Sequence, residues 1–191
     1  MNQAFNQTTY FFRKKVFKLF GGSFKVFDND GRVLFYSEQK AFRLKEDLRI
    51  YSDESKKEEL INIKTPQILD FSAIYHVTDS TTKEQVGSLK RKGFKSIISD
   101  EWLFLSNDLK EIGKMKEKSI GGALLSRFIN LIPQKYIIID SEQREIALIS
   151  QFFNPFILKY QLTFTNPNQS IDKRLILAAG ILLCSIEGRQ Q

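Results

Sequence analysis

The most apolar stretch of the chain lies near its end, at residues 175–186. As a helix it would be about 18 Å long, whereas a bilayer core is about 30 Å thick and needs about 20 apolar residues. Lys173 and Arg174 precede the stretch, and Glu187 and Arg189 follow it. A helix that is apolar on every side must still be buried. The stretch therefore predicts a helix buried in the centre of a protein core, with a membrane tail anchor as the alternative.

The residues around this stretch carry signals for a helix start and a helix end. Ser170 or Asp172 can accept hydrogen bonds from the free N–H groups of the first turn, and Asp172 also suits the positive end of the helix dipole. Gly188 stands where helices commonly end.

Most of the remaining chain alternates short apolar stretches with turn-forming residues, which is typical of β-strands. The clearest hairpin signal is Asp-Asn-Asp-Gly at 28–31, between 24–27 and 33–36, because Gly and Asn tolerate the positive φ of tight turns. The segment does not fit a calcium-binding EF-hand loop. With Gly31 at the sixth position of such a loop, Val26 and Ser37 would occupy the first and twelfth positions, where carboxylate ligands are required. Further strands are expected at 10–20, 49–52, 60–64, 68–77, 84–92, 96–105, 111–117, 136–140, 145–151 and 157–165.

These strands and the apolar segment together predict the fold class. A helix that is apolar all round needs apolar walls on every side, and a closed barrel supplies them while removing exposed sheet edges. We expect a mainly β fold, a closed antiparallel barrel of about twelve strands around a buried hydrophobic C-terminal helix. One short helix is expected near 119–130, where apolar residues recur at helical spacing. No linker divides the chain, so 1–191 is read as one domain with its core at about 9–188.

The cysteine count, the first residues and the net charge bear on the cellular compartment and on possible partners. A single cysteine, Cys184, cannot form an intramolecular disulfide or a four-cysteine zinc site, and it favours a reducing compartment. The first residues are polar and lack the apolar stretch of a signal peptide. A cytoplasmic location is expected. The net charge of +7 suits anionic lipid, nucleic acid or an acidic protein, and equally an ordinary soluble surface.

Several motifs, in their order along the chain, resemble the tubby C-terminal-like superfamily, which includes the LURP-one-related proteins and the phospholipid scramblases. The motifs are Gln-Phe-Phe-Asn-Pro-Phe at 151–156 followed by Tyr160, Asp-Lys-Arg-Leu at 172–175 leading into Ala178-Ala179, and Asp-Glu-Trp at 100–102 after the Lys-Arg-Lys strand at 90–92. The hairpin at 27–35 also fits, so the resemblance spans roughly 9–188.

The resemblance implies a twelve-stranded barrel around a hydrophobic helix, and it implies function weakly. Tubby domains bind phosphoinositides, and scramblases are associated with calcium-dependent lipid movement. This chain departs from the scramblase pattern, because residues 165–170 contain no carboxylate, no cysteine cluster is present, and no Pro-rich N-terminal arm precedes the domain. Calcium-dependent scrambling is therefore the weakest of the functions that the resemblance suggests.

No catalytic constellation is recognisable. His76 is the only histidine, and it lacks an evident nucleophile partner in the sequence. Cys184 lies in an apolar stretch, where burial suppresses thiol reactivity. The pairs Gly21-Gly22 and Gly121-Gly122 lack the Lys-Ser/Thr of a phosphate-binding loop. We expect no enzyme activity, no metal and no cofactor.

The basic clusters are the best functional lead. The candidate headgroup-binding residues are Lys90, Arg91, Lys92 and Lys95; in a strand Lys90 and Lys92 share one face and Arg91 points to the other. Two further clusters are Arg13-Lys14-Lys15 with Lys18, and Lys110 with Lys114, Lys116 and Lys118. Solvated strand-edge lysines are the competing interpretation.

Two functions from different classes follow. The first is a non-enzymatic module that binds anionic phospholipid headgroups, peripheral at the membrane and without a transmembrane segment. The second is a structural or regulatory domain whose ligand is another protein. Nucleic acid is disfavoured, because the core claims most of the aromatic residues that would stack on bases.

Overall fold

The computed structural model describes residues 2–15, 22–39, 47–65, 73–92, 101–118, 133–152, 154, 156–167 and 170–187. These residues form the short helix η1 (Gln3–Asn6), twelve strands and the helix α2 (Lys173–Glu187). The strands are β1 (Thr9–Lys15), β2 (Gly22–Phe27), β3 (Val33–Gln39), β4 (Asp47–Tyr51), β5 (Glu59–Lys64), β6 (Ile74–Asp79), β7 (Gln85–Arg91), β8 (Glu101–Leu105), β9 (Glu111–Glu117), β10 (Lys135–Asp140), β11 (Glu145–Phe152) and β12 (Ile157–Phe164).

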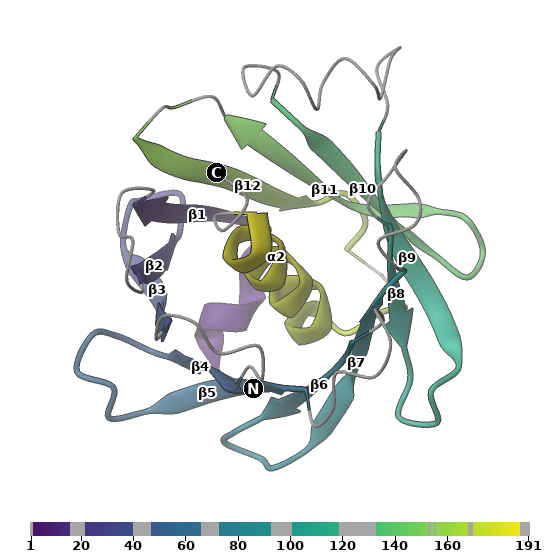
Figure 1. The fold of residues 1–191 in the computed structure, drawn as a ribbon, viewed down its shortest axis with the longest axis horizontal. Helices are drawn as coiled ribbons and strands as arrows, with labels where there is room; N and C mark the ends of the chain where they lie inside the picture. Colours follow the sequence, from purple (N-terminus) through teal and green to yellow (C-terminus); the bar gives the residue numbers. More distant parts are fainter. Residues whose placement is uncertain are drawn as a thin grey trace.

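The twelve described strands form one closed antiparallel barrel. Each strand pairs with its neighbours in the sequence, and β12 returns to pair with β1. Figure 1 shows α2 inside the ring of strands. The predicted closed barrel around a central helix is confirmed, while the helix expected near 119–130 falls outside the described residues.

The predicted strands are recovered with shifted ends. The expected strand at 68–77 is β6 and begins at Ile74, and the one at 96–105 is β8 and begins at Glu101; residues 66–72 and 93–100 lie outside the described ranges. The hairpin predicted at residues 28–31 joins β2 to β3.

Five hairpins share one construction at one end of the barrel. In each hairpin the register shifts by one residue, so that one residue of the second strand has no direct partner on the first strand. This β-bulge turns an extra side chain toward the core. Each turn contains one residue with a φ between 57° and 78°: Gly31, Lys56, Lys83, Leu109 and Gln143. The bulged residues are all apolar and lie in or against the core: Leu34, Leu60, Val86, Ile112 and Ile146.

The barrel therefore has two different ends. The hairpin end carries the five turns at 28–32, 52–58, 79–84, 106–110 and 140–145. The far end is formed by the last residues of β1, β3, β5, β7, β9 and β11 and the first residues of the strands that follow them. α2 begins at the hairpin end, where Arg174 contacts Asp79, and its last turn lies beside Lys14 near the far end.

α2 fills the barrel as the sequence predicted. Its residues from Arg174 to Ser185 are all buried. The strand β1 approaches the helix closely at Gly180, where an added Cβ would lie 2.9 Å from Cζ of Phe12. No described helix combines the length and hydropathy needed to span a membrane.

Hydrogen bonds fix both ends of α2. Asp172 caps the first turn, since its Oδ1 accepts from the backbone N–H of Arg174 at 2.8 Å. Ser170, the other predicted cap, instead donates to Asp140 at 3.4 Å. At the last turn, the buried ammonium of Lys14 donates to the carbonyl oxygens of Cys184 and Ser185 at 3.3 and 3.2 Å. A cation at a helix C-terminus stabilises the negative end of the dipole.

Candidate functional site

Four of the residues that carried the family resemblance have structural roles. At the far end, Gln151 accepts a hydrogen bond through Oε1 from the backbone N–H of Gln134, which ties β11 to the start of β10. Asn154 accepts through Oδ1 from the backbone N–H groups of Phe156 and Ile157, at 3.0 and 2.9 Å, and so shapes the turn into β12. Tyr160 and Trp102 are core residues, each 1% exposed.

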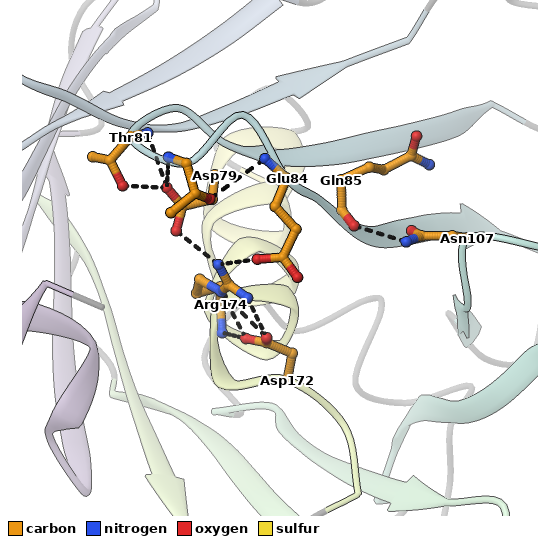
Figure 2. A network of polar contacts seen from close by, with 8 residues as sticks. Asp79, Thr81, Glu84, Gln85, Asn107, Asp172 and Arg174 are labelled. Atoms are coloured by element: carbon orange, nitrogen blue, oxygen red, sulfur yellow. Dashed lines mark hydrogen bonds and ion pairs between the residues drawn. The ribbon is translucent and has the colours of Figure 1, made fainter.

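A polar network surrounds Arg174 at the hairpin end (Figure 2). Its guanidinium donates to Asp79 at 2.7 Å, to Glu84 at 2.9 Å and to Asp172 at 2.6 Å. Asp79 also accepts from the backbone N–H and the hydroxyl of Thr81. Asp79 and Glu84 flank the β6–β7 turn and Asp172 precedes α2, so the network joins the start of α2 to that turn.

The ionisation of this network argues for a structural role. Burial alone would raise the pKa of Asp79, but hydrogen bonds from Thr81 and Arg174 outweigh it and lower that pKa to about 2. The hydrogen bond to Asp172, with those to Asp79 and Glu84, raises the pKa of Arg174. Neither Asp79 nor Arg174 changes charge near neutral pH, which a general acid or base must do.

The two side chains that could act as nucleophiles, Ser88 beside the partly exposed His76 and Cys184 in α2, are both buried. Nδ1 of His76 lies 2.9 Å from Oγ of Ser88, the distance of a base from a serine nucleophile, but Ser88 is 0% exposed. Burial raises the pKa of the Cys184 thiol, which keeps it protonated and unreactive. Within the described ranges, no group of three or more His, Cys, Asp or Glu side chains is placed to hold a metal ion.

Strand pairing brings two of the predicted basic clusters together on the outside of the barrel. Lys90 is the partner of Leu103 on β8, and Leu103 is the partner of Lys114 on β9. One step toward the far end, Lys92 bonds to Glu101, which is the partner of Lys116. We call the outward-facing lysines Lys90, Lys92, Lys114 and Lys116 the basic face.

Arg91 lies on the opposite side of β7 from the basic face. It is the partner of the buried Trp102, and its Cζ lies 5.9 Å from the centre of that ring. The alternation expected for residues 90–92 is therefore seen, and it separates Arg91 from the two lysines. Lys95, the fourth predicted residue, lies outside the described residues.

The basic face is compact, and among the described residues one carboxylate, Glu101, forms an ion pair with it. Its lysines are spaced by about 7 Å along a strand and about 10 Å across two strand spacings. Glu101, with its side chain 26% exposed, is the carboxylate in these two rows, and it binds Lys92 at 3.1 Å. The exposed residues Lys118 and Lys135 extend the positive charge toward the far end, joined by a backbone hydrogen bond of 2.7 Å.

The N-terminal cluster divides between the two sides of β1. Lys14 points inward to α2, whereas Arg13 is exposed and has Lys159 and Lys25 as its partners on β12 and β2. We call Arg13, Lys25 and Lys159 the basic row. The guanidinium of Arg13 lies over the ring of Phe27 at 4.7 Å, and Lys25 pairs with Glu54. Lys18 lies outside the described residues.

Sequence reasoning missed that Lys114 and Lys116 join Lys90 and Lys92. The signal that would have found this is the turn at 106–110, since Ser106-Asn107-Asp108 marks a tight hairpin whose register pairs 103 with 114. Lys25 and Lys159 were not singled out, because their places beside Arg13 depend on the register of β2 and β12 against β1.

One comparison identifies relatives of the chain. A family model described as LURP-one-related matches residues 8–184, which takes in every strand and most of α2. No curated protein and no solved structure matches the chain significantly.

Proposed function

Because the chain belongs to the LURP-one-related family and its barrel presents a lysine-rich outer wall, we propose that it is a non-enzymatic module that binds anionic phospholipid headgroups. The observation that carries the proposal is the meeting of Lys90, Lys92, Lys114 and Lys116 on one face. A cytoplasmic protein with this face would attach peripherally to the membrane.

Lysine chemistry suits this ligand. Each ammonium is a compact charge with three donors, which binds phosphate oxygens without requiring a fixed geometry. A lysine near an anionic bilayer is worth about 1 kcal/mol, so the three lysines that are not paired with Glu101 contribute about 3 kcal/mol. That corresponds to a dissociation constant on the order of several millimolar. The basic face alone therefore gives weak, reversible and salt-sensitive attachment.

The chemistry of the basic face favours binding over catalysis. Lysines at the surface present charge, and the buried thiol of Cys184 adds no reactive group to this face. The ion pair between Lys92 and Glu101 leaves Lys90, Lys114 and Lys116 to meet an anionic surface.

A protein ligand is the second candidate, since an acidic protein surface would satisfy the same lysines. Co-sedimentation of the intact protein with vesicles separates the two candidates. The lipid proposal predicts binding to phosphatidylcholine vesicles that contain anionic lipid, little binding to phosphatidylcholine alone, and release as salt is raised. Equal binding to both vesicles, or binding to neither, would refute the lipid proposal and favour the protein ligand.

A further inference from the structure

Two aromatic side chains among the described residues of the far end are exposed. Phe152 ends β11 and is 47% exposed, and Phe156 immediately precedes β12 and is 63% exposed. The hydrogen bonds from Phe156 and Ile157 to the Asn154 side chain hold the turn between them. A large apolar side chain with about half or more of its surface exposed loses free energy in water, and two of them at one turn indicate a surface that something apolar covers.

Basic side chains lie beside these rings. Phe152 is the partner of Lys159, which is in turn the partner of Arg13, and Arg13 is the partner of Lys25. One line across four strands therefore begins with an exposed phenyl ring and continues with the three cations of the basic row. Apolar side chains beside lysine and arginine are the composition of surfaces that lie in the headgroup region of anionic bilayers.

The basic face occupies the same end. Lys90 is the next-to-last residue of β7, and Lys92 directly follows that strand. Lys116 is the next-to-last residue of β9. Lys118 and Lys135 continue the positive charge toward the far end. The basic face and the exposed rings therefore lie toward one end of the barrel. The basic row runs from that end along the outer wall, as far as Lys25, which pairs with Glu54 of a hairpin-end turn.

The hairpin end has the opposite character. Its five turns carry more carboxylates than basic side chains, including Asp30, Asp53, Asp108 and Glu142. Two apolar side chains are exposed at this end, Leu109 at 51% and Val33 at 37%, but each is accompanied by these acidic turns. An anionic bilayer repels this end and attracts the far end, so the charge distribution favours one orientation.

We propose that the far end of the barrel faces the membrane and that Phe152 and Phe156 insert among the lipid headgroups. This inference rests on the proposed lipid function and adds to it an orientation and an apolar contact. Insertion of the two rings also supplies the affinity that the basic face lacks, because attachment by charge and apolar contact together is much stronger than either alone.

Lipid-quenched fluorescence tests the orientation directly. Phe156→Trp places a reporter at the far end, and Leu109→Trp is its matched control, an exposed apolar residue at the hairpin end. The native Trp102 is 1% exposed and gives the same background in both. With anionic vesicles that carry a brominated acyl chain, Phe156→Trp should shift to shorter wavelength and be quenched, while Leu109→Trp should change little.

A double variant measures the apolar contribution to binding. Phe152→Ser/Phe156→Ser should keep the wild-type melting temperature, because both rings are exposed, and should bind anionic vesicles about tenfold more weakly for each ring removed. If the protein sediments with these vesicles and the reporter at 109 is quenched, or neither reporter is, the orientation is wrong and the lipid function stands. If neither the wild type nor any variant sediments with anionic vesicles, the proposed lipid function is wrong and the proposed orientation is wrong too.

Discussion

Lys90 of β7 and Lys114 of β9 share one cross-strand partner, Leu103 of β8. Strand pairing alone thus joins lysines that are 24 positions apart in the sequence. Trp102 and Phe104, on either side of Leu103, point into the core and are 1% and 0% exposed. The same alternation that fills the barrel with aromatic rings therefore places the lysines on its outer surface.

Removing the cation at the start of α2 should destabilise the fold. Arg174→Leu leaves the carboxylate of Asp79, whose side chain is 2% exposed, without its charged partner. Breaking a buried ion pair in this way costs about 3–5 kcal/mol. Urea unfolding of Arg174→Leu, Asp79→Asn and the double variant measures the coupling. The double variant should lose less stability than the two single losses added, and simple additivity would contradict the pairing.

Acid should weaken the same contact. The pKa of Asp79 is about 2 in the folded protein and 3.8 for a free side chain, so the folded state favours the charged form. This contribution, about 2 kcal/mol, is present above pH 4 and is lost as the pH falls toward 2. Thermal melts between pH 6 and pH 2 should show a steeper loss for the wild type than for Asp79→Asn. Parallel curves would show that Asp79 is not the group that titrates.

A methyl group added to the middle of α2 should destabilise the protein despite the better helix propensity of alanine. Gly180→Ala gains about 1 kcal/mol of propensity, but its Cβ would meet the Phe12 ring at 2.9 Å, and overpacking costs about 1–3 kcal/mol. In a Phe12→Leu background the clash is removed, and the same change should become neutral or stabilising. Denaturation midpoints of the wild type, the two single variants and the double variant test this expectation.

The thiol of Cys184 should report global unfolding. Its side chain is buried and burial raises its pKa, so the thiolate is not available to react in the folded state. Labelling by a thiol reagent at pH 8 should be at least about 1,000-fold slower than in denaturant, in proportion to the small unfolded fraction. Rapid labelling of the folded protein would mean that α2 opens locally.

The sequence was sufficient to predict the barrel and its central helix, because both follow from burial. A twelve-residue apolar stretch cannot span a bilayer, and only a closed wall of strands buries it on all sides. The tight turns were also visible as Asp- and Ser-rich segments. A further signal was present and unused: the bulged residues Leu34, Leu60, Val86 and Ile112 recur every 26 positions, which marks a repeated hairpin.

The surface was harder to predict, because it depends on pairing between segments. Lys14 looked like one member of a basic cluster, yet its inward position on β1 places its ammonium on the last carbonyls of α2. Arg91 similarly packs over Trp102. Composition counts such residues as surface charge, whereas the strand register decides which of them face solvent.

The central claim is that the basic face binds anionic phospholipid, and one comparison tests it most directly. Lys90→Glu/Lys114→Glu reverses two charges on the basic face, and Lys57→Glu/Lys110→Glu makes the same charge change on exposed turns at the hairpin end. Vesicle titrations at one ionic strength should show that the first variant binds anionic vesicles about tenfold or more weakly than the second, with equal melting temperatures. Equal affinities for the two variants would contradict the claim.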